Sequence, residues 1–319
     1  KLKGTGNYRI LINGKPSGTM AKSVADALKM IPAEQIKSVE VITSPSAKYD
    51  AEGSGGIINI ITKKKTAEGV SGSINTSAGT RSNNGAFNLN AKTGRLSLTG
   101  NLGVNHAYPQ NSKVVVFNSS VVDGVTNTVS QNGFSKWSRV GYNGSAGLDY
   151  DFNSYHNISS TVKFNRFSNG GPGSSDILTN NVFSQNIRDM DMGFNNMDWN
   201  VDYRKTSKKE GEELSVSAQL SRGRNTSDFT NRFVSEGIPD FTLIGGNTGK
   251  NNEYTLQTDY TYPFSKTTTL ETGLKGIFRN IISDYDQNAQ DFDYDQNVGS
   301  AYGVLGFKLS KKITAKAGL

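Results

Sequence analysis

From residue 66 to its end, the chain alternates apolar and polar side chains with a period of two. In the segment 253–262, Tyr254, Leu256 and Tyr260 fall on one face, and polar residues such as Glu253 fall on the other. Such alternation indicates β-strands that belong to a sheet with one apolar face and one polar face. The same pattern recurs in residues 96–104, 158–165 and 213–220.

The connections between these strands alternate between short and long. The short turns are expected near Thr93-Gly94-Arg95, Asn153-Ser154-Tyr155, residues 206–211, Ser265-Lys266-Thr267 and Ser310-Lys311-Lys312. Long polar connections are expected at residues 107–138, 168–192, 223–251 and 281–296. Only the connection near residues 81–84 is short where the pattern requires a long one. Strands of about ten residues with this arrangement are typical of outer-membrane barrels, which have short periplasmic turns and longer outer loops. A soluble sandwich has no reason to collect its long loops at one end.

The pattern contains about ten full strands and the start of an eleventh, and it stops within a strand. An open sheet in a bilayer would leave the backbone groups of its edges unpaired in hydrocarbon. Plugged outer-membrane transporters close with about 22 strands. We therefore expect a mainly β fold in which residues 66–319 form the first half of a transmembrane antiparallel β-barrel, as a fragment or the ordered part of a larger one.

Residues 1–65 have a different texture and predict a small α+β unit. Strands are expected at Tyr8–Asn13, Val39–Thr43 and Ile57–Thr62, because Val and Ile fit a pleated surface better than a helix. A short helix is expected at Val24–Met30, and Pro32 ends it.

Three phrases within residues 7–65 carry a family resemblance. They are Ile10-Leu11-Ile12-Asn13-Gly14-Lys15-Pro16, Leu28-Lys29-Met30-Ile31-Pro32-Ala33-Glu34-Gln35-Ile36, and residues 39–63. In this order they resemble the end of the plug domain of TonB-dependent outer-membrane receptors, especially the Bacteroidetes-type form. The resemblance implies that residues 1–65 are the C-terminal part of a plug that occludes a barrel in the outer membrane of a Gram-negative bacterium.

The resemblance also implies function and partners. It implies energy-coupled uptake of an unknown ligand, driven by the TonB–ExbB–ExbD complex, with outer-membrane lipid around the barrel and outer-membrane partner proteins as further candidates. Where many relatives have Arg-Gly-Pro, this chain has Thr43-Ser44-Pro45. A plug-to-barrel ion pair made by that Arg therefore does not carry over.

By the same resemblance, the loop between the last two plug strands has an occluding or gating role. Contact of its polar groups with the barrel wall is favoured over contact with a substrate. The candidate residues of this loop are Ser44, Pro45, Ser46, Lys48, Tyr49, Asp50, Glu52, Gly55 and Gly56.

A second candidate site is an acidic run with interleaved aromatic residues. Its carboxylates could gather around a hard cation such as Ca²⁺, or the run could contact a ligand at the cell surface. Spacing by two on an extended hairpin would instead place them along one solvated face, and this interpretation is favoured. These residues are Asp284, Asp286, Asp291, Asp293 and Asp295.

Composition narrows the remaining function classes. The chain of 319 residues has no Cys, so disulfide scaffolds and thiolate metal sites are excluded, and its net charge is +7. Its basic runs lack the interleaved aromatics of single-strand nucleic-acid grooves, so no nucleic acid is expected. His106 and His156 have no nucleophile pattern around them, and no metal, cofactor or enzyme activity is expected. A plugged barrel serving as a structural or secretion-associated subunit is the alternative to an importer. Gly170-Gly171-Pro172-Gly173 and Gly245-Gly246 are interpreted as loop tips.

Overall fold

The computed structural model describes residues 9–12, 15–16, 36–42, 57–62, 68–235, 237–286, 291–309 and 313–318. These residues form two separate β-sheets, one of 4 strands and one of 11. Within these ranges, no helix has the length and apolar character needed to cross a bilayer. The helix expected at Val24–Met30 lies outside the described residues.

The small sheet contains β1 (Arg9–Ile12), β2 (Lys15–Pro16), β3 (Ile36–Ile42) and β4 (Ile57–Thr62), in the order β2-β1-β4-β3. Strand β4 pairs in parallel with β1 and antiparallel with β3. Because β4 has a neighbour on each side, its apolar residues form the core, and Ile57 and Ile60 are 2% and 0% exposed. The predicted strand Ile57–Thr62 is confirmed to the residue.

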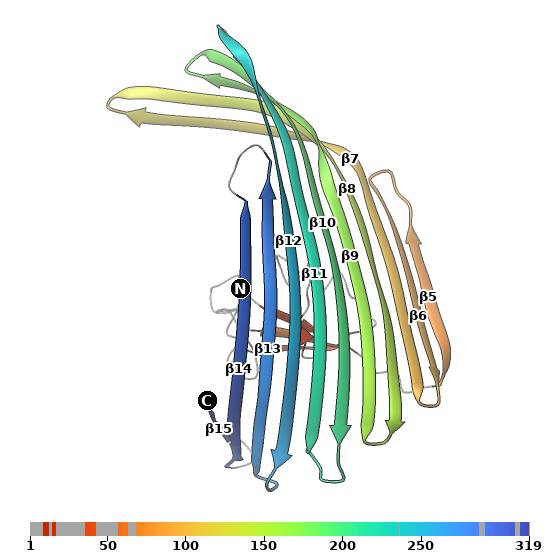
Figure 1. Ribbon diagram of the computed structural model, residues 1–319. Helices are drawn as coiled ribbons and strands as arrows, with labels where there is room; N and C mark the ends of the chain where they lie inside the picture. Colours follow the sequence, from red (N-terminus) through yellow and green to blue (C-terminus); the bar gives the residue numbers. More distant parts are fainter. Residues whose placement is uncertain are drawn as a thin grey trace.

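The large sheet is an up-and-down meander in which every strand pairs only with its neighbours in sequence. Ten long strands and a short eleventh confirm the strand count predicted from the alternation. Figure 1 shows a tall curved wall, with the small sheet drawn behind it near the middle of its height. The strands are β5 (Gly69–Ser77), β6 (Ser82–Thr93), β7 (Leu96–Val122), β8 (Val125–Asn153), β9 (His156–Thr179), β10 (Val182–Thr206), β11 (Glu213–Ser235), β12 (Ile238–Pro263), β13 (Thr268–Tyr285), β14 (Phe292–Lys308) and β15 (Thr314–Gly318).

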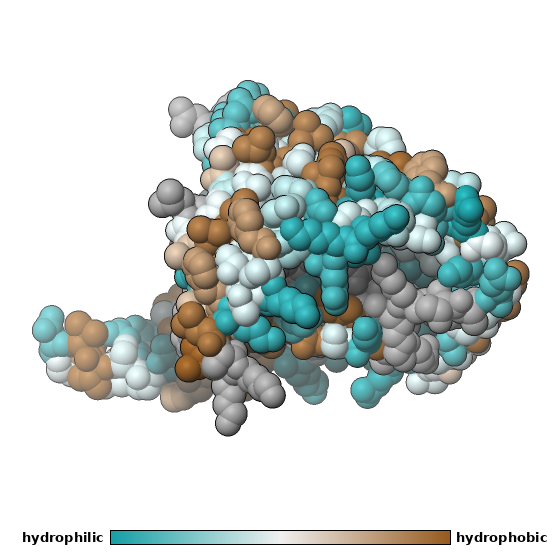
Figure 2. Space-filling model, turned by 90° about the horizontal axis from the view of Figure 1, so that it is seen from below, coloured by the Kyte–Doolittle hydropathy of each residue, from teal (hydrophilic) through white to brown (hydrophobic). Residues whose placement is uncertain are grey.

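The two faces of this wall differ as the alternation predicts. Residues directly opposite each other on paired strands share a face, and Leu220 is opposite both Trp199 and Tyr254. The rings of Trp199 and Tyr254 are 45% and 47% exposed, and Leu256 is 57% exposed. A continuous exposed apolar band of this kind requires a non-aqueous neighbour, which for a barrel wall is lipid. Figure 2, seen from below, shows hydrophobic groups along much of the outer margin of the curve.

The prediction of long irregular loops is wrong, because most residues of these connections belong to strands. Strands β7 and β8 have 27 and 29 residues, far more than the roughly 9–11 that cross a bilayer. Two-residue turns close two of these hairpins, with positive φ at Asp123 and Gly124 and at Asn180 and Asn181. Turns of this kind match the twist of paired strands, so the polar segments continue as ribbons beyond the membrane instead of forming irregular loops.

The interpretation of Gly170–Gly173 as a loop tip is also wrong, because this segment lies inside β9. The β8–β9 pairing is interrupted between Ser135 and Ser138, opposite Gly171 and Pro172. A proline has no N–H for the ladder, which explains the interruption. Gly171 has φ +144°, and a Cβ there would meet the carbonyl oxygen of Lys136. The glycine therefore permits a close backbone approach in a strand. Gly245 and Gly246 likewise lie within β12.

We expect Gly171→Ala to destabilise the intact protein by about 1–3 kcal/mol, since alanine must adopt a strained backbone conformation there. Urea unfolding of the protein in lipid vesicles measures this loss. The matched control is Gly299→Ala in β14, where an added Cβ has no atom within 4 Å. Equal stability of the two variants would show that the β9 interruption does not depend on glycine.

The short turns lie where the sequence predicts them, at residues 94–95, 154–155, 207–212 and 264–267, while 310–312 lie outside the described residues. In the third turn, Ser207 and Tyr260 donate hydrogen bonds of 2.5 and 2.6 Å to the Glu212 carboxylate and lower its pKa. Lys209 places its Nζ 3.7 Å from the centre of the Tyr262 ring. These contacts hold the β10–β11 turn against the neighbouring strand β12 at the short-turn end of the wall.

Candidate functional site

The face of the wall opposite the lipid-facing band is polar and partly buried. We call it the lumenal polar face, because it lies on the concave side of the curve. Asn196, Asp198 and Thr255 are 7%, 3% and 7% exposed. A barrel wall with a polar inner face can line a hydrated or plugged passage. The face includes Asn143, Ser145, Lys163, Asn165, Asn196, Asp198, Ser217, Gln219, Ser221, Glu253, Thr255, Gln257, Arg279 and Gln296.

One buried cluster on this face joins β9 and β10. Lys163 is directly opposite Asp198, so a cation and an anion are neighbours across the two strands. The side chain of Asn196 donates a hydrogen bond of 3.0 Å to Oδ2 of Asp198. Among the described residues, Oδ1 of Asp198 is buried with no hydrogen-bond partner. Burying such an oxygen is costly, so this carboxylate has remaining capacity to accept a hydrogen bond inside the passage.

A second cluster joins β12, β13 and β14. Arg279 Nε donates to Glu253 Oε2 at 2.7 Å, and its Nη1 donates to Gln296 at 3.0 Å. Both charged side chains are 17% exposed. Because the three residues oppose one another across paired strands, the cluster fixes the register of the inner wall. Sequence reasoning placed Glu253 on a polar face, but it did not identify Arg279 as its partner.

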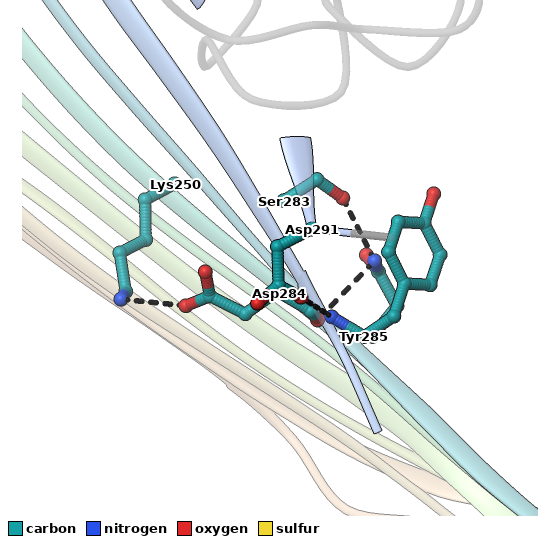
Figure 3. Close-up of polar contacts among 6 residues, drawn as sticks. Lys250, Ser283, Asp284, Tyr285 and Asp291 are labelled. Atoms are coloured by element: carbon teal, nitrogen blue, oxygen red, sulfur yellow. Dashed lines mark hydrogen bonds and ion pairs between the residues drawn. The ribbon is translucent and has the colours of Figure 1, made fainter. Parts of the chain in front are cut away.

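The acidic run lies beyond the membrane band, on the outward face of the β12–β14 ribbon. Figure 3 shows Asp284 reaching Lys250 and Asp291 reaching the backbone of Tyr285, through contacts of 2.9 Å each. Asn247 donates a hydrogen bond of 2.8 Å to Ser283 in the same region.

The remaining aspartates of the run also have partners within the protein. Asp293 and Asp295 both accept hydrogen bonds of 2.9 Å from Asn280. The backbone N–H of Asp286 donates to Gly246 at 3.0 Å. In the part of the chain that the structure describes, no three acidic or histidine side chains gather as metal ligands. A ligand-binding role for this run stays a prediction.

The candidate residues of the plug loop, Ser44 to Gly56, all lie outside the described residues. The strands that flank this loop, β3 and β4, are paired with each other from Ile42 and Ile57 onward. The sidechain amide of Asn59 donates to Glu40 across them at 2.9 Å. The occluding role of the loop remains a prediction.

The two ends of the wall can be assigned to sides of the membrane by labelling in cells. The sequence has no Cys, so each introduced cysteine is unique. We expect cysteines at the exposed positions Ser119 and Thr242, on the long ribbons, to react with an impermeant thiol reagent. Cysteines at Ser154 and Lys266, in short turns, should stay unlabelled until the cells are permeabilised. The reverse pattern would invert the topology.

Comparisons with known proteins agree with this architecture at both ends of the chain. Residues 2–57 match the TonB-dependent Receptor Plug Domain family, and residues 205–319 match the Outer membrane protein beta-barrel family. The chain is 35% identical over 79 residues to the probable TonB-dependent siderophore receptor PirA of Acinetobacter baumannii. That match covers 21% of this chain and 10% of PirA.

The fold is similar to that of solved receptors. The ferric-catecholate import receptor Fiu from E. coli K12 in its open form gives a TM-score of 0.53 at 13% identity, covering 98% of this chain and 62% of that chain. The closed form of Fiu also gives 0.53 at 13% identity, covering 98% and 57%. At this identity the likeness shows the fold alone. The chain spans less than two thirds of the length of these solved receptor chains.

Proposed function

Because the chain belongs to the TonB-dependent receptors of the Gram-negative outer membrane, we propose that the whole protein takes up a ligand through a plugged β-barrel. The family is a class of receptors and not of enzymes, and we assign no catalytic step to this chain. The Bacteroidetes-type assignment stays a prediction.

One observation carries the proposal: the region that matches the plug family forms a small sheet of its own, drawn behind the wall in Figure 1, and the inner face of that wall is polar. A wide barrel with such a lining would be an open channel, so an occluding unit is needed to keep the permeability barrier. We propose residues 1–65 as that unit and residues 66–319 as the first part of the wall.

The proposal includes energy coupling and partners. Displacing a plug that otherwise stays in the barrel requires an energy source. Family resemblance supports the TonB–ExbB–ExbD complex as that source. The ligand class to test first is a ferric siderophore, because the relatives reported above are named siderophore or ferric-catecholate receptors. We keep the loop from Ser44 to Gly56 as the proposed gating segment.

Uptake of ⁵⁵Fe by an iron-starved deletion strain tests the function. Cells complemented with the intact receptor should import at least one of a panel of ferric catecholate, hydroxamate or citrate complexes, and import should stop when TonB is deleted. Import that continues without TonB would contradict energy coupling. Failure with every iron complex, but TonB-dependent growth on a vitamin, glycan or peptide, would replace only the ligand class.

A structural or secretion-associated subunit is not favoured, since the matched relatives are named as receptors. The deletion strain distinguishes the two functions. Loss of a structural subunit would change the composition of the outer membrane without changing ligand uptake.

A further inference from the structure

Four cationic side chains lie on the outward face just beyond the apolar band. They are Arg166 on β9, Arg222 and Arg224 on β11, and Lys250 on β12, and we call them the outer basic row. Arg166 is opposite Asn195, Asn195 is opposite Arg224, and Arg224 is opposite Lys250. Neighbouring strands are about 4.8 Å apart, so the row extends roughly 15 Å across the wall. All four residues are exposed.

Their charges are only partly compensated within the protein. Arg224 and Lys250 are like charges directly opposite each other, an arrangement that is destabilising by itself. Lys250 has an ion pair with Asp284 at 2.9 Å, and Arg222 donates to the Tyr254 hydroxyl at 3.3 Å. Arg166 and Arg224 have no ion pair with any residue that the structure describes. The row therefore has capacity for an external anion.

The row lies at the outer membrane–water interface. Arg222 is the tenth residue of β11 counted from Glu213, which follows a short turn, and about 9–11 residues cross a bilayer. The next cross-strand row toward the membrane contains the exposed aromatic rings of Trp199, Tyr254 and Phe278. Aromatic rings of this kind mark the headgroup level, which is also the level of lipid phosphates.

An apolar groove opens on the same face beside Arg166. It has a volume of about 620 Å³, and its lining includes Ile74, Phe87, Leu102, Phe164 and Arg166. Gly144 lets Phe164 and Leu102 pack over its backbone, since a Cβ there would clash with the Phe164 ring and lie 2.9 Å from Leu102. The groove therefore has room for part of an acyl chain, and one of its lining residues is a cation.

We propose that the outer basic row binds the phosphate headgroup of an anionic lipid of the outer leaflet, with one of its acyl chains in the groove beside Phe164. A soluble anion is a poorer occupant, because Asp191 and Asp228 are directly opposite each other on the same face farther from the membrane, and Asp286 bonds through its backbone to Gly246, the residue opposite Asp228. A polyanion approaching from solvent meets these carboxylates first, whereas a lipid reaches the row from the membrane side.

Titration of the intact receptor in detergent with phosphorylated lipid A, followed by native mass spectrometry, tests the proposal. The variant Arg166→Gln/Arg222→Gln/Arg224→Gln removes three charges from the row. Each cation near an anionic lipid contributes roughly fivefold, so we expect about a hundredfold weaker binding. The matched control Lys205→Gln/Lys208→Gln/Lys266→Gln removes three charges at the short-turn end and should bind as the unaltered receptor does.

Further arms separate the sources of phosphate. Dephosphorylated lipid A should bind as weakly as the triple variant does, and millimolar inorganic phosphate should not displace lipid A. Unchanged binding by the triple variant, or equal binding of the dephosphorylated lipid, would overturn the proposal. Displacement by inorganic phosphate would replace the lipid with a soluble anion and overturn it as well. If the triple variant does not fold, Arg224→Gln alone should weaken binding about fivefold, and unchanged binding by it would be equally decisive.

Discussion

Val216→Arg is expected to destabilise the intact receptor by about 2–4 kcal/mol, the range for arginine at the midplane of a barrel's lipid face. Val216 is 42% exposed on the outward face. It is opposite Thr258, which lies midway along β12 between Tyr254 and Tyr262. The new guanidinium would therefore lie in hydrocarbon between two levels of aromatic rings. Urea unfolding of the receptor in lipid vesicles measures the change.

The neighbouring position supplies the control. Ser217 is on the lumenal polar face, opposite Asp202 and Gln257. An arginine there meets a carboxylate and an amide, so Ser217→Arg should change stability by less than about 1 kcal/mol. Similar losses at both positions would mean that the wall has a core on each face, as in a water-soluble sandwich, and would contradict the membrane assignment.

Arg279→Met is expected to cost about 3 kcal/mol, near the lower end of the range for breaking a buried ion pair. The Glu253 carboxylate is only 17% exposed. Without Arg279 it keeps the hydrogen bond of 3.3 Å that the Thr255 hydroxyl donates to it. The desolvation cost of this anion is then no longer offset by its guanidinium partner. The same unfolding measurement in vesicles detects the loss.

Pairing this change with Glu253→Leu separates the charge effect from the loss of packing. The double variant has no anion left to desolvate, so it should recover at least half of the stability lost by Arg279→Met. A double variant that is less stable than either single variant would show that the two residues stabilise the wall independently, and not as a pair.

The alternation of side chains predicted the wall because lipid and lumen impose opposite demands on successive residues. Tyr254 and Leu256 had to face one way and Glu253 the other, and the structure confirms this arrangement. The short turns were equally predictable, since polar residues and Gly94 interrupt the alternation there. Both features depend on local sequence alone.

The parts that were missed depend on pairing between strands. Beyond the membrane no lipid enforces alternation, so the ribbons of β7–β10 look like polar loops. The pair Asp123-Gly124 carried the signal, because this dipeptide favours a two-residue hairpin turn. The partners of Arg279 and Asp198 could not be predicted, since they depend on a register that is set by strands far along the chain.

The meander has a kinetic consequence. Each strand of the wall hydrogen-bonds only to the strands before and after it in sequence. Every strand pairing in the wall can therefore form by closing the connection of a single hairpin. Closing a short loop costs little chain entropy compared with bringing distant segments together. The wall can therefore grow hairpin by hairpin, with each completed ribbon offering its free edge as the template for the next strand.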